Sequence, residues 1–359
     1  MKKRLLSLCA VLCLMVCLAV GAAATQLTGE PNITAQTTMK ELWSHPSLAG
    51  SGIWLHPKYS FSPELQQCLY DDQTLQQYVG PENAQACADS LNLVIELYNA
   101  GTQITYPLYT ADEIAANPAC KNVELYYVPA TQPNAKYVIL LEGNSATRTG
   151  EMKECYAPIK QLHDMGYAVF ALRYRVFVDI ANNAPLDDLA RAIGYITQNA
   201  DAFSVQTDNY AIMGFSSGGQ LAGVMASYEY GYGHYGLPKP GALLLGYPVN
   251  DFFEVKPLYH IVYDFGATEP RYYCYNISDL ITPDYPPTYF WYGENDTTLM
   301  MMGYDLQGPV LRKALEDNGV PHRVIVYKNA PHASAVGTGT DAEGWLSDAA
   351  AFWEEQTAS

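Results

Sequence analysis

Residues 213–219 read MGFSSGG, and this stretch decides the fold. It follows the apolar run 210–213 and precedes residues 220–227, which have a helical pattern. A strand that turns directly into a helix around a serine is the context in which a nucleophilic serine is presented at the edge of a sheet. The stretch therefore predicts a strand, a sharp turn and a helix, with a serine at the turn.

The glycines identify which serine is the nucleophile. In such a turn the residues two before and two after the central one nearly touch, so both must be very small. Around Ser216 these neighbours are Gly214 and Gly218. Around Ser217 the residue two before is the bulky Phe215. We therefore predict Ser216 as the nucleophile.

A serine hydroxyl needs a base to take its proton and an acid to orient that base. On this type of turn the chain order is serine, acid, histidine, with each residue on a loop at the carboxyl end of a strand. His332 follows the last predicted strand, residues 324–327. The other downstream histidines precede the seventh strand or start the eighth at the opposite edge of the sheet: His234, His260 and His322. We predict His332 as the base.

The acid is expected after the seventh strand, residues 288–291. This strand leads into residues 293–296, which read GEND and offer Glu294 and Asp296. Asp296 is further from the strand end, where the loop has room to turn its carboxylate towards His332. We predict Asp296 as the acid, with Glu294 as the alternative.

The chain after residue 101 alternates short apolar runs with helical segments. Continuous apolar strands between helices indicate a parallel sheet covered on both faces. Few residues separate the first strands, which indicates an antiparallel start, and residues 247–286 interrupt the alternation. We predict an α/β-hydrolase fold over residues 103–359, with a mostly parallel eight-stranded sheet flanked by helices and a lid or substrate-binding insertion at 247–286. The predicted strands are 104–108, 123–128, 137–141, 167–172, 210–213, 242–245, 288–291 and 324–327.

The first 24 residues have the pattern of an export signal. Three basic residues at positions 2–4 precede an apolar run over residues 5–20 and a small-residue cleavage site at 22–24. The alternative is an uncleaved membrane anchor, but the apolar run is shorter than the ~20 residues that span a bilayer. We therefore expect cleavage after residue 24 and a secreted, extracellular protein.

The mature chain is strongly acidic. The signal removes three basic residues, which leaves 17 basic against 37 acidic residues and a net charge of −20, compared with −17 for the full chain. Nucleic acids and anionic membranes repel such a charge, so neither is expected as a partner. The sequence leaves the oligomeric state open.

Five cysteines remain after cleavage, an odd number at irregular spacing. A disulfide framework is therefore not expected, although a Cys68–Cys87 bridge is one alternative. The sequence has no Cys/His cluster with zinc-ligand spacing, so we expect neither a metal nor a cofactor.

Residues 25–102 are predicted to form a small helical flank or cap. Thr38 and Glu41 have the spacing of a capping box, which marks a helix start. The apolar-periodic run 84–100 stops at Gly101, a typical residue just after a helix.

Three further stretches support a family resemblance. Residues 168–175 read AVFALRYR, residues 185–192 read PLDDLARA, and residues 332–337 read HASAVG. With the turn at Ser216, these stretches resemble bacterial α/β-hydrolases of the acetyl-xylan esterase and feruloyl esterase type, within the hormone-sensitive-lipase-like group. The resemblance covers roughly residues 103–356. It implies hydrolysis of short acyl esters, often acetyl groups on plant polysaccharides, without a cofactor.

The chain departs from that family after its third strand. There the family usually has a glycine run led by His or Pro, whose amides bind the oxyanion, whereas residues 142–145 of this chain read EGNS. Backbone amides of Asn144, Ser145 and Ser217 are the predicted oxyanion donors. A carboxylate at Glu142 would oppose a developing oxyanion.

The substrate is expected to be a small-molecule or oligosaccharide ester. Tyrosine-rich segments at 228–235 and 259–275 are compatible with stacking on a sugar, but tyrosine is also common in exported proteins and in lids. One alternative is a general short-chain carboxylesterase or lipase. Another is a non-catalytic binding protein on a hydrolase scaffold, against which the three triad residues argue.

Overall fold

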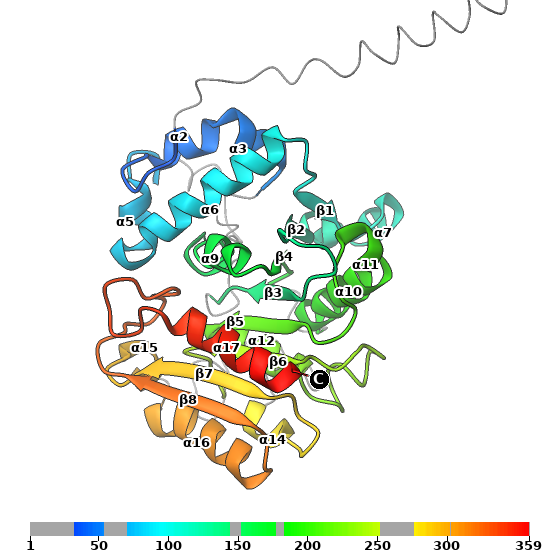
Figure 1. Ribbon diagram of the computed structural model, residues 1–359, viewed down its shortest axis with the longest axis vertical. Helices are drawn as coiled ribbons and strands as arrows, with labels where there is room; N and C mark the ends of the chain where they lie inside the picture. The colour runs from blue at the N-terminus through cyan, green and yellow to red at the C-terminus, as the bar shows by residue number, and fades with distance from the viewer. Residues whose placement is uncertain are drawn as a thin grey trace, which may run out of the picture. The chain divides into compact units, whose positions relative to one another are not determined.

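The computed structural model describes residues 32–53, 70–143, 152–176, 183–251, 276–301 and 303–358. Within these residues eight strands form one sheet in the order β1-β2-β4-β3-β5-β6-β7-β8 (Figure 1). The strands are β1 Thr105–Pro107, β2 Glu124–Val128, β3 Tyr137–Leu141, β4 Ala168–Arg173, β5 Ala211–Phe215, β6 Ala242–Gly246, β7 Thr288–Gly293 and β8 His322–Tyr327.

The sheet begins antiparallel and continues parallel. β2 pairs antiparallel with β1 and β4, and the pairs from β4 to β8 are all parallel. Every residue of β3 to β7 is buried, which explains why these strands are continuous apolar runs rather than alternating ones. The α/β-hydrolase fold predicted from the sequence is confirmed.

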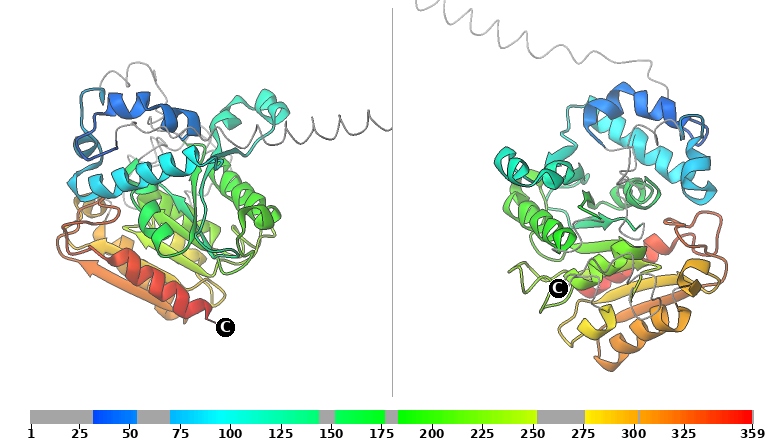
Figure 2. Two further views of the ribbon diagram at one scale, coloured as in Figure 1. Left: turned by 45° about the horizontal axis from the view of Figure 1, so that its top comes forward. Right: turned by 180° about the vertical axis from the view of Figure 1, so that it is seen from behind.

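Helices cover both faces of the sheet. α9 and α17 lie on one face, and α10, α12, α14 and α16 lie on the other (Figures 1 and 2). The helices of this part of the chain are α7 Ala111–Ala116, η1 Pro118–Asn122, α8 Met152–Cys155, α9 Ile159–Asp164, α10 Ala184–Gln198, α11 Ala200–Phe203, α12 Ser216–Met225, α14 Ile277–Leu280, α15 Thr297–Met301, α16 Tyr304–Asp317 and α17 Trp345–Thr357.

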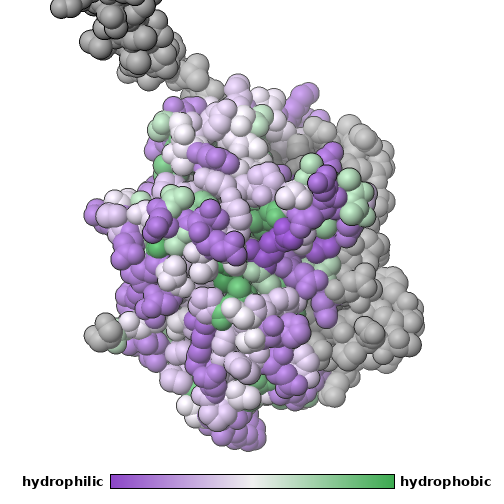
Figure 3. Space-filling view, turned by 90° about the vertical axis from the view of Figure 1, so that its right-hand side faces the viewer, coloured by the Kyte–Doolittle hydropathy of each residue, from purple (hydrophilic) through white to green (hydrophobic). Residues whose placement is uncertain are grey.

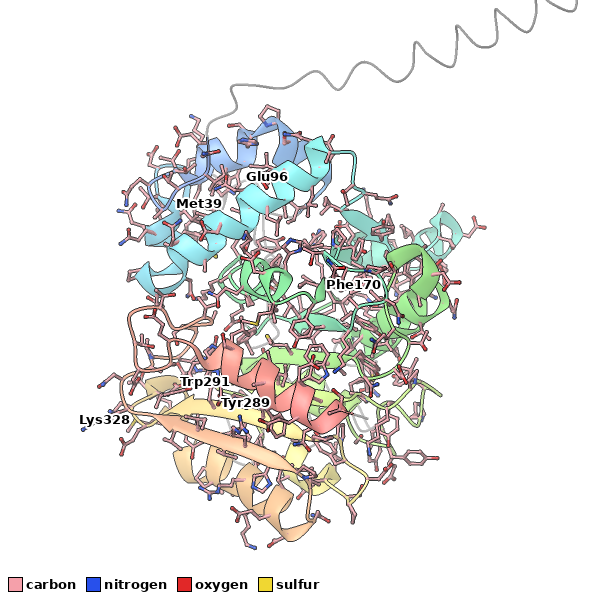
Figure 4. All side chains as sticks on the ribbon, viewed as in Figure 1. Met39, Glu96, Phe170, Tyr289, Trp291 and Lys328 are labelled. Carbon is pink, nitrogen blue, oxygen red and sulfur yellow. The ribbon has the colours of Figure 1, made fainter. Side chains whose placement is uncertain are left out.

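Aromatic side chains fill the space between the sheet and its helices. Tyr289 and Trp291 lie two residues apart on β7, so they point to the same face, beneath α17 (Figure 4). Trp345 of α17 packs against both rings, at centroid distances of 6.2 and 5.6 Å. Phe170 fills the other face and stacks on Tyr127 at 4.9 Å. These contacts hold the strand ends, and hence the loops after them, in place.

Two helix starts differ from the sequence prediction. α12 begins at Ser216 itself rather than at residue 220, because the turn has no intervening loop. The sequence of residues 310–318 predicts a helix from residue 310, but α16 begins at Tyr304 and contains Pro309 in its second turn. Proline has no amide hydrogen, so α16 lacks the hydrogen bond that residue 309 would otherwise donate to the carbonyl of residue 305.

The N-terminal flank is helical, with α2 Met39–Ser44, α3 Pro46–Ser51, α5 Leu75–Val79 and α6 Pro81–Asn99. The predicted capping box of Thr38 and Glu41 is present. Gly101, just after α6, has φ +91°, which only glycine adopts readily. α6 packs against α8 and α9, so the flank and the sheet belong to one compact unit, Ile33–Ser359.

Several predictions lie wholly or partly outside the described residues. These are the signal segment 1–24, Cys68, Cys274 and, within the insertion, residues 252–275. Cys87, Cys120 and Cys155 are buried thiols rather than disulfides, so a Cys68–Cys87 bridge is not formed. Among the helices that the structure describes, none is both long and apolar enough to cross a membrane.

Candidate active site

Ser216 lies at the point where β5 ends and α12 begins. Its φ is +50°, in the left-handed region that costs a non-glycine residue of order 1 kcal/mol or more. A Cβ at Gly214 would clash with the carbonyl of Gly218, and a Cβ at Gly218 would clash with the carbonyl of Glu142. Both glycines are therefore required by close backbone approach, as the sequence predicted.

The structure brings together Ser216 from the turn between β5 and α12, Asp296 from the loop after β7 and His332 from the loop after β8. His332 Nε2 lies 3.0 Å from Ser216 Oγ. His332 Nδ1 lies 2.7 Å from Asp296 Oδ2. The Asp296 side chain has no exposed surface, and that of His332 is 16% exposed. One imidazole thus contacts a serine hydroxyl and a buried carboxylate through its two nitrogens.

Asp296 is held by the start of α15 as well as by His332. Its Oδ1 accepts hydrogen bonds from the amides of Thr298 and Leu299, both at 2.9 Å. This arrangement leaves Oδ2 directed at the imidazole. Glu294, the alternative acid, is exposed. The structure therefore places Asp296, not Glu294, against His332.

The loop carrying His332 packs tightly on the loop carrying Asp296. A Cβ at Gly293 would clash with the carbonyl oxygen of Ala330. Lys328, labelled in Figure 4, marks the carboxyl end of β8, where this loop starts, and its carbonyl accepts a hydrogen bond from Asn295 Nδ2 (3.0 Å). Direct packing of the two loops fixes the distance between imidazole and carboxylate.

A buried carboxylate that the sequence did not predict lies beside the strand-to-helix turn at Ser216, which is called the elbow below. Glu154 of α8 is 2% exposed. Its Oε2 accepts from the amide of Gly143 (2.7 Å), and its Oε1 accepts from the hydroxyl of Tyr247 (3.0 Å). The Tyr247 hydroxyl accepts in turn from the amide of Ala335 (3.2 Å). Glu154 therefore links the loop after β3 to the loop that carries the histidine.

Tyr247 is the second residue that was missed. It directly follows β6, has φ +38°, and its ring lies 4.7 Å from that of His332. Burial, reinforced by the charge of Glu154, raises the pKa of Tyr247 well above its ordinary value. The hydroxyl thus keeps its proton and donates to Glu154. Its position at the carboxyl end of a strand was a signal that pointed to the site, whereas no local pattern singled out Glu154.

The predicted oxyanion residues are only partly described. Asn144 and Ser145 lie outside the described residues, and Ser217 is the second residue of α12. Gly143 packs against Ser216, since a Cβ there would lie 2.6 Å from the serine Cβ. The carbonyl of Glu142 accepts from the buried Tyr174 hydroxyl (2.6 Å). The backbone leading to residues 144 and 145 is therefore held beside Ser216.

The Glu142 side chain is buried near Tyr156 rather than solvated at the site. Burial, then the neighbouring Tyr126, Cys155 and Glu142, raise the pKa of Tyr156, while Arg173 opposes this. The carboxylate that contacts the loop after β3 through a hydrogen bond to Gly143 is that of Glu154.

Two of the stretches that carried the resemblance meet in a buried ion pair. Arg175 Nη2 lies 2.7 Å from Oδ1 of Asp188, and the Arg175 amide donates to the same carboxylate (2.8 Å). The Asp188 side chain is fully buried and also accepts from Tyr109 (2.6 Å). This pair fixes the chain just after Tyr174, whose hydroxyl holds the loop after β3. The ion pair therefore positions the backbone next to the site and does not itself contact the triad residues.

The N-terminal flank reaches the site directly. Asn83 of α6 is fully buried, and its Nδ2 donates to the carbonyl oxygens of Ala333 (3.2 Å) and Val79 (3.0 Å). Ala333 follows His332 and has φ +63°. The flank therefore helps to hold the strained backbone beside the imidazole.

Among the described residues, no group of three or more His, Cys, Asp or Glu side chains is arranged to hold a metal ion. The chemistry that the described geometry offers is that of a serine hydroxyl beside an imidazole and a carboxylate, which is suited to acyl transfer.

Comparison with known proteins supports this fold. The chain has the α/β-hydrolase fold. The BD-FAE family model matches residues 123–231, which include β2 to β5, the elbow and α12. This match covers less than a third of the chain.

Solved structures with the same fold include several esterases. An acetyl ester-xyloside bifunctional hydrolase from Caldicellulosiruptor lactoaceticus is 20% identical, with a TM-score of 0.56 over 70% of this chain and 95% of that chain. The carboxylesterase Cest-2923 from Lactobacillus plantarum WCFS1 is 22% identical, with a TM-score of 0.55 over 65% and 92%. A truncated carbohydrate esterase from gut microbiota is 16% identical, with a TM-score of 0.53 over 67% and 92%.

A curated relative is endo-1,4-beta-xylanase B of Butyrivibrio fibrisolvens, 22% identical over 199 residues. The match spans 52% of this chain but only 30% of that protein. At 16–22% identity these solved structures show the shared fold, and the BD-FAE match, which covers the turn at Ser216, agrees with the resemblance noted from the sequence.

Proposed function

We propose that this protein is a secreted serine esterase that hydrolyses short, acetyl-type acyl esters with Ser216, His332 and Asp296 as its catalytic triad. The observation that carries the proposal is the imidazole of His332, which is hydrogen-bonded to Ser216 Oγ at 3.0 Å and to Asp296 at 2.7 Å. This is the arrangement in which a base removes the serine proton while a buried acid fixes the tautomer of that base.

The reaction follows from this arrangement in two halves. Ser216 Oγ attacks the ester carbonyl carbon as His332 Nε2 takes the hydroxyl proton, and Asp296 stabilises the imidazolium that forms. The imidazolium then protonates the leaving alcohol, and an acyl group remains on Ser216. Water attacks this acyl-enzyme with His332 as base, which releases the carboxylic acid and restores the serine.

Backbone amides of Asn144, Ser145 and Ser217 are proposed to bind the oxyanion. Ser217 lies in the first turn of α12, where the helix dipole favours negative charge. Asn144 and Ser145 follow Gly143, whose own amide donates to Glu154. The Gly143 amide is thus already engaged with Glu154, and Glu154 acts as a positioning residue that holds the start of this loop.

An acetylated sugar is proposed as the substrate. The support comes from the BD-FAE match, from the likeness to an acetyl ester-xyloside hydrolase and a carbohydrate esterase, and from the expected export of the chain. A second candidate, a general short-chain carboxylesterase, is supported by the likeness to carboxylesterase Cest-2923. The two candidates share the triad and differ only in the alcohol side of the ester.

An ester panel tests both candidates. We expect kcat/KM to fall from p-nitrophenyl acetate to butyrate to octanoate, and we expect acetate release from acetylated xylo-oligosaccharides. Preference for octanoate would contradict short-acyl specificity. Hydrolysis of p-nitrophenyl acetate without acetate release from any acetylated sugar would leave the general carboxylesterase. N-terminal sequencing of the exported protein tests cleavage after residue 24.

A further inference from the structure

We propose that a pocket at the amino ends of the parallel strands, opposite the carboxyl ends where Ser216 lies, binds a neutral saccharide. The pocket has a volume of about 550 Å³, within the roughly 300–1,000 Å³ of small-molecule sites. Tyr228, Glu229 and Tyr230 line it from the turn after α12, and Asp279 and Asp284 line it from the segment before β7. This proposal does not rest on the function proposed for the triad.

The pocket and the triad lie at opposite ends of the parallel strands. α12 leads away from Ser216, and its ten residues span about 15 Å. The pocket residues then follow α12 or precede β7, so they lie at the amino ends of the strands. Figure 1 shows the turn after α12 and the segment around α14 on the right, while β7 and β8 point to the left. The side seen on the right of Figure 1 is mainly hydrophilic, with small separate apolar patches (Figure 3).

Tyr228 provides an exposed ring with a fixed orientation. The residue is 64% exposed, and Tyr232 packs against its ring edge to face at 5.7 Å and 75°. Gly233 packs on the ring, since a Cβ there would lie 2.5 Å from Cδ2 of Tyr228. The amide of His234 donates to the Tyr228 carbonyl (3.0 Å). The backbone thus holds the ring in solvent, where it can stack on the apolar face of a pyranose at little cost in side-chain entropy.

The carboxylates of the pocket are oriented acceptors. Asp284 accepts from Tyr232 (2.5 Å) and Lys239 (2.9 Å), and the hydrogen bonds from these two groups lower the pKa of Asp284. Asp279 Oδ2 accepts from Asn276 Nδ2 (3.0 Å). An ionised carboxylate has about four lone-pair sites, so each of these groups retains acceptor capacity.

These features together select the ligand class. Glu229, Asp279 and Asp284 repel phosphates, sulfates and other anions. A sugar ring presents several hydroxyl donors around an apolar face, which matches oriented acceptors beside an exposed tyrosine. Lys239 already neutralises part of the charge at Asp284, which lowers the attraction for a second cation. A neutral saccharide therefore fits the pocket better than an organic cation.

Binding of unsubstituted xylohexaose tests the proposal. This probe contains no ester, so its binding can be measured by calorimetry independently of hydrolysis. We expect Tyr228→Ala to weaken binding by about tenfold or more, because truncating a stacking tyrosine removes its contact. Tyr228→Phe keeps the ring and is expected to bind within about threefold of the parent protein. Val326→Ala, another exposed apolar side chain but on β8, is the matched control and should bind like the parent.

Three results would overturn the proposal. Unchanged xylohexaose affinity in Tyr228→Ala would place the sugar elsewhere, including at the triad. Absence of binding for xylohexaose, cellohexaose and mannohexaose would remove the saccharide altogether. Binding of tetramethylammonium that is lost in Glu229→Gln, with no saccharide bound, would make the pocket a cation site. Circular dichroism confirms that the variants are folded, and p-nitrophenyl acetate hydrolysis reports separately on the triad.

Discussion

β7 has an aspartate near each end, and the two aspartates behave differently. Asp296, three residues past the carboxyl end, has no exposed side-chain surface and accepts from His332 and from two amides of α15. Asp284, four residues before the amino end, has a side chain that is 63% exposed and accepts from Tyr232 and Lys239.

The difference shows that burial, rather than residue type, decides what a carboxylate does. At the carboxyl ends of the strands, Asp296 and Glu154 direct their oxygens at protein donors, so they hold the proposed catalytic groups in position. At the amino edge, Asp284 is oriented but still faces water, so it remains available to a ligand. The two edges of one sheet thus suit different tasks, and the following experiments test that contrast.

Ser216→Ala should have the largest effect. It removes the proposed nucleophile, so kcat for p-nitrophenyl acetate should fall by about 10⁵ to 10⁶. Labelling by a fluorophosphonate probe, followed by peptide mass spectrometry, should also disappear. Normal turnover in this variant, or a label found on Ser217, would contradict the assignment of the carboxyl edge.

Asp296→Asn should lower kcat by about 10⁴, because an amide does not hold the imidazole in the tautomer that accepts the serine proton. Glu294→Gln is the matched control, because Glu294 is exposed two residues earlier in the same loop. Its kcat should stay within about twofold of the parent. Equal losses in the two variants would show that the buried acid has no special role.

Glu154→Gln should lower kcat about 10- to 100-fold, with KM for a small ester within about twofold. Gly143 and Tyr247 donate to different oxygens of Glu154, and in glutamine one of these positions carries an NH2 group, which cannot accept. Tyr247→Phe removes the same contact from the other side, so the double variant should lose no more than the larger single loss. Fully additive losses, or a change confined to KM, would contradict a positioning role.

Tyr228→Ala should leave kcat/KM for p-nitrophenyl acetate within about twofold, since the pocket lies at the opposite edge of the sheet. Release of acetate from polymeric acetylated xylan should fall by about threefold, through loss of a second anchoring point. A large loss on the small ester would mean that the two edges are coupled rather than separate.

Asp284→Asn should have the smallest effect, on stability alone. Because the hydrogen bonds from Tyr232 and Lys239 lower the folded-state pKa of Asp284, its ionised form stabilises the fold above the ordinary aspartate pKa. This contribution is lost as pH falls through the lowered folded-state pKa. The free energy of unfolding should therefore differ from that of the parent by less than about 1 kcal/mol at pH 7, and the difference should shrink as pH falls below the ordinary aspartate pKa. A difference that grows on acidification would contradict this sign.

Much of the carboxyl edge was predictable because it depends on local chain geometry. The glycines at 214 and 218 follow from how closely a strand-to-helix turn brings its backbone together, and the order of serine, acid and histidine follows from the order of the strands. Strands β3 to β7 were found because they are buried on both faces, and such strands are continuous apolar runs. Asp296 was preferred over Glu294 because the loop needs length to turn back, and the structure places it there.

What the sequence by itself determined, then, is the fold, the elbow at Ser216 and the placement of His332 after the last strand. Only the tertiary structure decided that Glu154 joins Gly143 to Tyr247, that α6 supports the histidine loop, and that the tyrosines after α12 lie at the opposite edge from the triad. The physical reason is the distance along the sequence between the residues that interact. Turns and strand periodicity arise from neighbouring residues, whereas a buried carboxylate or an exposed ring acquires its role from groups that are distant in the sequence and meet only when the sheet and its helices pack.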